Sequence, residues 1–152
     1  MSNILWEPSD KEKNTSNLAK FTSLVNKKYK ISLSEEYSDI YNWSINNIDK
    51  FWEAVFTDSN IKYSQLYTQV VDDVDKMPGA EWFKSLRFNY AENLLLNKNN
   101  DIAIEYYCEN KIKGSISYSH LNHLVAKVSK SFKSMGLKSG DRVAAVMPNI
   151  PE

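Results

Sequence analysis

The sequence of 152 residues has one cysteine, four glycines, four prolines and no net charge. Nineteen Lys and Arg residues balance nineteen Asp and Glu residues, so no excess charge would attract nucleic acid or an anionic membrane. The single cysteine, Cys108, excludes an internal disulfide and fits a reducing compartment. No apolar run approaches the roughly 20 residues that cross a bilayer, and residues 1–8 lack a signal-peptide pattern. We therefore expect a cytoplasmic chain whose partners include neither nucleic acid nor membrane.

Aromatic residues are abundant, with four Trp, nine Tyr and six Phe, and most of them lie between residues 1 and 100. Apolar spacing in this segment predicts short helices that begin near Thr15 or Ser16, at Ser34, near Asn46 or Asn47, and at Asn89. A few short helices cannot bury that many rings against one another, because each ring offers about 150–250 Å² of surface. We expect this segment to lie against something larger, as a wrap rather than as an independent domain.

Residues 101–152 follow an α/β pattern. The sequence predicts a hairpin of strands 102–107 and 114–118, joined by a turn at 109–111. It then predicts a helix from Ser119, which carries the clearest apolar stripe of the chain and ends before Gly136. Residues 142–147 include the run VAAV, which is apolar on both faces and predicts a buried strand of a parallel sheet. The last three residues, 150–152, suit the start of another helix, so we expect the chain to be part of a longer protein.

Two features could suggest nucleotide or acyl chemistry, and both have simpler interpretations. Gly140 follows a Lys-Ser pair, but a phosphate-binding loop needs several glycines between a strand and a helix. The predicted order at Gly140 is helix, turn and strand, which favours an ordinary turn. Cys108 has no basic neighbour that would clearly lower its pKa, so a structural thiol is the better interpretation.

Two further groups could suggest a metal site. Asp72, Asp73 and Asp75 lack the glycine and the distal glutamate of a calcium-binding loop, which favours an exposed acidic loop. His120 and His123 are three residues apart on one predicted helix, but two ligands do not complete a zinc site. They flank the apolar stripe, as surface or boundary histidines do. The residues alone therefore predict no catalytic, cofactor-binding or metal-binding residue in this chain.

Several stretches, in order, resemble acetoacetyl-CoA synthetases, which are acyl-CoA ligases of the adenylate-forming superfamily. The most specific are MPGAEWF at 77–83 and LRFNYAENLL at 86–95. Three others agree: LWEPS at 5–9, WS at 43–44 and FWEAV at 51–55. ISYSHL at 116–121 and the run from Gly140 to Asn149 are similar to the general superfamily pattern. The chain departs from the family at Lys84 and Ser85, where a small pair is usual, and at His120, where an acidic residue is frequent.

The resemblance implies an α/β fold with two parts. Residues 1–100 would form the mostly helical N-terminal extension of acetyl- and acetoacetyl-CoA synthetases. Residues 101–152 would begin the AMP-binding domain with its first strand, helix and strand, and this domain would be incomplete. The implied partners are acetoacetate, for the whole enzyme, and the remainder of the chain's own polypeptide.

The resemblance also implies a function for the longer protein, an acid–thiol ligase. ATP, acetoacetate and CoA would give AMP, diphosphate and acetoacetyl-CoA through an acyl-adenylate, with Mg²⁺ accompanying the ATP. The family's nucleotide-binding and catalytic residues have no counterpart in residues 1–152, so we expect the chain alone to be inactive. Two alternatives stay open: a part of an acetyl- or propionyl-CoA ligase, and a stand-alone interaction module without catalysis.

Overall fold

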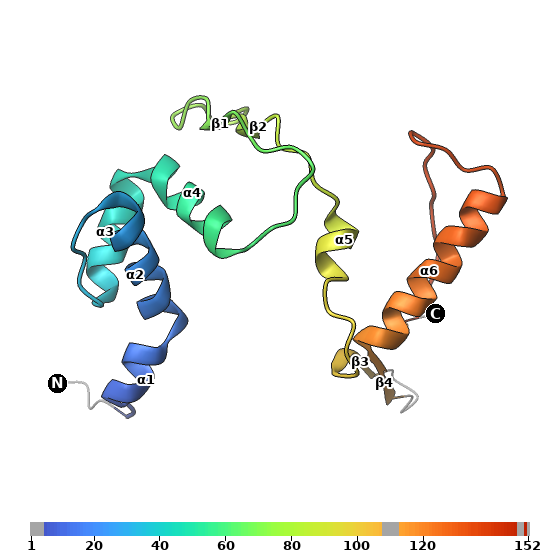
Figure 1. Ribbon diagram of the computed structural model, residues 1–152, viewed down its shortest axis with the longest axis horizontal. Helices are drawn as coiled ribbons and strands as arrows, with labels where there is room; N and C mark the ends of the chain where they lie inside the picture. The colour runs from blue at the N-terminus through green and yellow to red at the C-terminus, as the bar shows by residue number, and fades with distance from the viewer. Residues whose placement is uncertain (1–4, 108–112, 149–150, 152) are drawn as a thin grey trace. The chain divides into compact units, whose positions relative to one another are not determined.

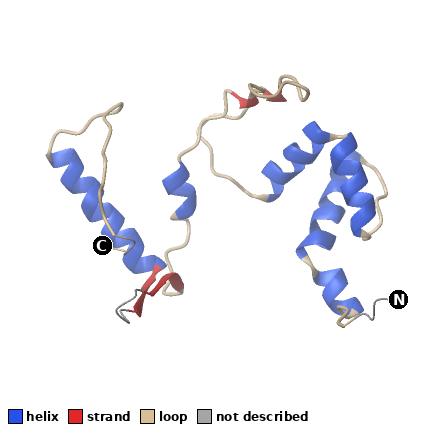
Figure 2. Ribbon diagram, turned by 180° about the vertical axis from the view of Figure 1, so that it is seen from behind, coloured by secondary structure: helices blue, strands red, loops and turns tan. Residues whose placement is uncertain are grey.

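The computed structural model describes residues 5–107, 113–148 and 151, and it divides at Asn89 into two compact units. The first unit comprises residues 1–89 and the second comprises residues 90–152. Helices dominate, and the strands form two short antiparallel pairs (Figure 2). Helices and strands thus both occur, as the predicted α/β class requires.

The described residues of the first unit form four helices and one pair of strands (Figure 1). The helices are α1 (Asp10–Thr15), α2 (Asn17–Tyr29), α3 (Tyr37–Asn46) and α4 (Ile48–Asp58). The strands are β1 (Gln69–Val71) and β2 (Trp82–Lys84), which pair antiparallel. Strand β1 also packs against α4.

Serine side chains cap the first residues of α1 and α2, but no side chain caps α3. Ser16 caps α2 by accepting a hydrogen bond from the backbone N–H of Ala19, as the sequence predicts. Helix α1 was not predicted, although Ser9 and Glu12 form the capping box that begins it. The prediction that Ser34 caps α3 is wrong, because α3 begins at Tyr37 and the Ser34 hydroxyl instead donates to the carboxylate of Asp39 at 2.6 Å.

The core of the first unit is small and lies where α2, α3 and α4 meet. Its buried centre consists of Val25, Ile40 and Ala54, one residue from each helix. Half-buried aromatic and aliphatic side chains surround this centre. Most of the large apolar side chains of the unit therefore remain outside the core, as the aromatic content of the sequence predicts.

The second unit contains α5 (Tyr90–Leu94), the antiparallel pair β3 (Ile102–Tyr107) and β4 (Lys113–Ser117), and α6 (Tyr118–Ser134). The predicted hairpin is confirmed, while its turn at 109–111 lies outside the described residues. Ser117 rather than Ser119 caps α6, and Gly136 follows its end with a φ of 89°, as a left-handed cap requires. No residue of α6 is buried.

The predicted strand at 142–147 is wrong for this structure. The segment is drawn as loop in Figure 2, and no backbone partner pairs with it in the described part of the chain. Val143 and Val146 are exposed, with relative exposures of 57% and 105%. A strand needs a neighbouring strand to satisfy its backbone, so apolar patterning alone does not create one.

Candidate functional site

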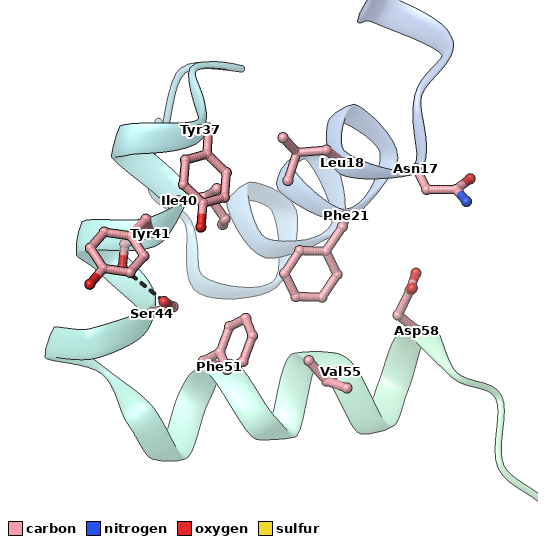
Figure 3. Close-up of a pocket in the computed structure, with 10 residues that line it drawn as sticks. All are labelled: Asn17, Leu18, Phe21, Tyr37, Ile40, Tyr41, Ser44, Phe51, Val55 and Asp58. Carbon is pink, nitrogen blue, oxygen red and sulfur yellow. Dashed lines mark hydrogen bonds between the residues drawn. The ribbon is translucent and has the colours of Figure 1, made fainter.

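An apolar groove lies between α2, α3 and α4 of the first unit (Figure 3). Its volume is about 440 Å³. We call it the interhelix groove and define it by the residues that line it: Asn17, Leu18, Phe21, Tyr37, Ile40, Tyr41, Ser44, Phe51, Val55 and Asp58. Tyr37, Ile40 and Tyr41 of α3 all face this groove.

Aromatic rings form the walls of the interhelix groove. Tyr37 and Tyr41, one turn apart on α3, stack with ring centroids 5.9 Å apart. Phe21 of α2 and Phe51 of α4 meet edge to face, also at 5.9 Å. Tyr37 is 68% exposed and Tyr41 is 49% exposed, so the groove is open to solvent rather than enclosed.

Polar groups are few in the groove and lie mainly at its rim. Asn17 and Asp58 stand at the end away from the two tyrosines (Figure 3). The Ser44 hydroxyl donates to the backbone carbonyl of Tyr41 at 2.8 Å and is therefore engaged within α3. This arrangement suits an apolar occupant better than a phosphate or a carboxylate.

A polar network on another part of α4 ties three segments together through Glu53. The Tyr29 hydroxyl lies 2.7 Å from Glu53 Oε2, to which it donates, and 2.8 Å from the Lys50 carbonyl. The Tyr67 hydroxyl donates to Glu53 Oε1 at 3.4 Å. Lys28 Nζ lies 3.5 Å from Glu53 Oε2.

The network shifts the acidity of both tyrosines. Burial raises the pKa of Tyr29 above its ordinary range, and the hydrogen bond to the Glu53 carboxylate raises it further. Burial and the charge of Glu53 raise the pKa of Tyr67 in the same way. Both phenols therefore stay protonated at neutral pH, and neither is an activated acid or base.

An aromatic cluster centred on Phe56 joins α4 to the segment that carries β1 and β2. Tyr63, Tyr67 and Phe83 each lie with ring centroids 5.2–5.8 Å from that of Phe56. Tyr67 and Phe83 also contact each other, at 5.3 Å. These rings pack on one another, which explains how a segment with little regular structure is held against the helices.

The predicted acidic loop around Asp72 is confirmed as a structural turn. Asp72 Oδ1 accepts hydrogen bonds from the backbone N–H of Glu81 at 2.7 Å and of Asp73 at 2.8 Å. The Glu81 N–H is the main reason that the pKa of Asp72 lies below its usual value, and the Asp73 N–H and Lys76 add to it. The carboxylate thus closes the turn between β1 and β2.

The two histidines and Gly140 that the sequence singled out lie in the second unit. His120 and His123 are exposed on α6, as predicted. Gly140 lies in a turn with a φ of 97°, which Asp141 closes by accepting from the Lys138 N–H at 2.7 Å. Cys108 lies outside the described residues. Within residues 5–107, 113–148 and 151, no three His, Cys, Asp or Glu side chains are grouped as a metal site would require.

Sequence reasoning missed Glu53, which organises the network on α4. Its two tyrosine partners lie 24 and 14 residues away in the chain, so no local pattern marks it. The groove was not predicted either, because it forms only where three separate helices meet. The described side chains of the first unit therefore form an open apolar groove and a separate hydrogen-bonded network around Glu53.

Known proteins that are similar to this chain match it over nearly its whole length. Residues 37–94 match the family model described as acetyl-coenzyme A synthetase N-terminus. The chain is 36% identical over 152 residues to an acetoacetyl-CoA synthetase of Danio rerio and 38% identical over 152 residues to one of Gallus gallus. Each alignment covers 97% of this chain and 22% of the relative.

A solved structure gives the same result for the fold. The acetoacetyl-CoA synthetase from Streptomyces lividans superposes with a TM-score of 0.81 at 27% sequence identity. The match covers 99% of this chain and 24% of that protein, so the chain spans about a quarter or less of the proteins it resembles. The predicted resemblance to the N-terminal part of such synthetases is therefore confirmed.

Proposed function

We propose that this chain, related in sequence and fold to the N-terminal part of acetoacetyl-CoA synthetases, is the N-terminal part of an acetoacetate–CoA ligase. The observation that carries the proposal is the match along 97% of the chain to relatives with that name. In the proposed reaction the acetoacetate carboxylate attacks the α-phosphate of ATP and displaces diphosphate. The CoA thiol then attacks the acyl carbonyl and displaces AMP, which leaves acetoacetyl-CoA.

We assign the chemistry of this ligase to residues beyond those present here. Binding ATP requires groups that neutralise and cradle its phosphates, and Mg²⁺ requires grouped oxygen ligands. The described residues do not fit either requirement: their glycines are scattered along the chain, and no three of their His, Cys, Asp or Glu side chains are grouped so that they could hold a metal ion. We therefore propose that ATP, CoA and Mg²⁺ bind to other parts of the whole enzyme, and that this chain has a structural role in it.

The proposal includes the partners and the location of the protein. The small-molecule partner would be acetoacetate, and the macromolecular partner would be the remainder of the same polypeptide. None of the described helices is sufficiently long and apolar to cross a membrane. We place the proposed ligase in the cytoplasm because a chain with a single cysteine fits a reducing compartment.

One alternative within the same enzyme class has a specific observation in its favour. The description of the family model that matches residues 37–94 names acetyl-coenzyme A synthetase and does not mention acetoacetyl-CoA synthetase. An acetyl- or propionyl-CoA ligase would match the same model. A non-catalytic interaction module is the alternative from another class, and the exposed aromatic groove favours it.

A substrate comparison tests the proposal. The complete translation product of the gene that encodes this chain would be purified and given ATP, Mg²⁺ and CoA with acetoacetate, acetate or propionate. We expect kcat/KM for acetoacetate to exceed that for acetate by at least about tenfold, which corresponds to 1.4 kcal/mol of transition-state discrimination. A preference for acetate or propionate would support the first alternative, and no acyl-CoA formation with any of the three acids would support the interaction module.

A further inference from the structure

We draw no further inference here: the strongest candidate, the interhelix groove between α2, α3 and α4, is an open apolar surface, and nothing in the described residues shows what covers it.

Discussion

The Glu53 network gives a prediction whose magnitude can be worked out from its distances. In Tyr29→Phe the short 2.7 Å hydrogen bond to the Glu53 carboxylate is lost, while the weaker contacts of Glu53 with Tyr67 and Lys28 remain. A hydrogen bond to a charged group contributes about 1.5–3 kcal/mol when buried. The Glu53 side chain is about one-third exposed, and solvent weakens a charged hydrogen bond. We therefore expect Tyr29→Phe to lower the free energy of unfolding by about 1–1.5 kcal/mol.

The assay can report the first unit selectively. All four tryptophans, Trp6, Trp43, Trp52 and Trp82, lie within residues 1–89, so urea unfolding followed by tryptophan fluorescence reports that unit. Measurements at low micromolar concentration limit association through exposed apolar surface.

A double-mutant cycle isolates the pairwise term. Tyr29→Phe, Glu53→Gln and the double variant should give a coupling of about 1 kcal/mol. Tyr37→Phe is the control, because its 68% exposed side chain should change stability by less than about 0.5 kcal/mol. A coupling near zero, or an equal loss in the control, would refute the role assigned to the network.

The remaining predictions concern pH, caps and one buried hydroxyl. Folding raises the pKa of Tyr29, so the stabilisation that its protonated hydroxyl provides is complete below the unfolded-state pKa of about 10 and should be lost as the pH rises above it. Urea titrations at a series of alkaline pH values should therefore show that the free energy of unfolding falls less steeply with pH for Tyr29→Phe than for the wild type. Lys30→Gly should raise unfolding free energy by about 0.5–1 kcal/mol, because Lys30 ends α2 at a φ of 55°; a loss measured in urea would contradict this. Thr22→Val should be neutral or stabilising by up to about 1 kcal/mol in the same assay, because within the described residues the buried Thr22 Oγ1 has no hydrogen-bond partner; a clear loss would reveal one. Ser9→Ala should cost about 1 kcal/mol and increase amide exchange in α1 alone, and unchanged exchange there would argue against the capping box.

Local chemistry explains which elements the sequence predicts well. The hairpin of β3 and β4 and the cap at Gly136 depend on residues close together in the chain, and both are found. Helix α1 could also have been predicted, because Ser9 and Glu12 have the spacing of a capping box.

Elements that depend on distant partners were missed or wrongly predicted. Strand β2 exists because Trp82 and Lys84 pair with Val71 and Gln69 of β1, and nothing in its own three residues predicts it. Residues 142–147 have a strand pattern but no neighbouring strand in the described chain, so they stay irregular. The role of Glu53 was not predicted for the same reason, because its hydrogen-bond partners are Tyr29 of α2 and Tyr67, which are distant in the sequence.

Exchange of labelled diphosphate into ATP reports adenylate formation without the later thioester step, so it shows directly whether this chain belongs to an acetoacetate–CoA ligase. We expect the complete translation product to catalyse this exchange when acetoacetate is present and CoA is absent, and we expect residues 1–152 alone not to catalyse it. Exchange catalysed by residues 1–152, or its absence in the complete protein, would contradict the assignment of this chain as the structural N-terminal part of an acetoacetate–CoA ligase.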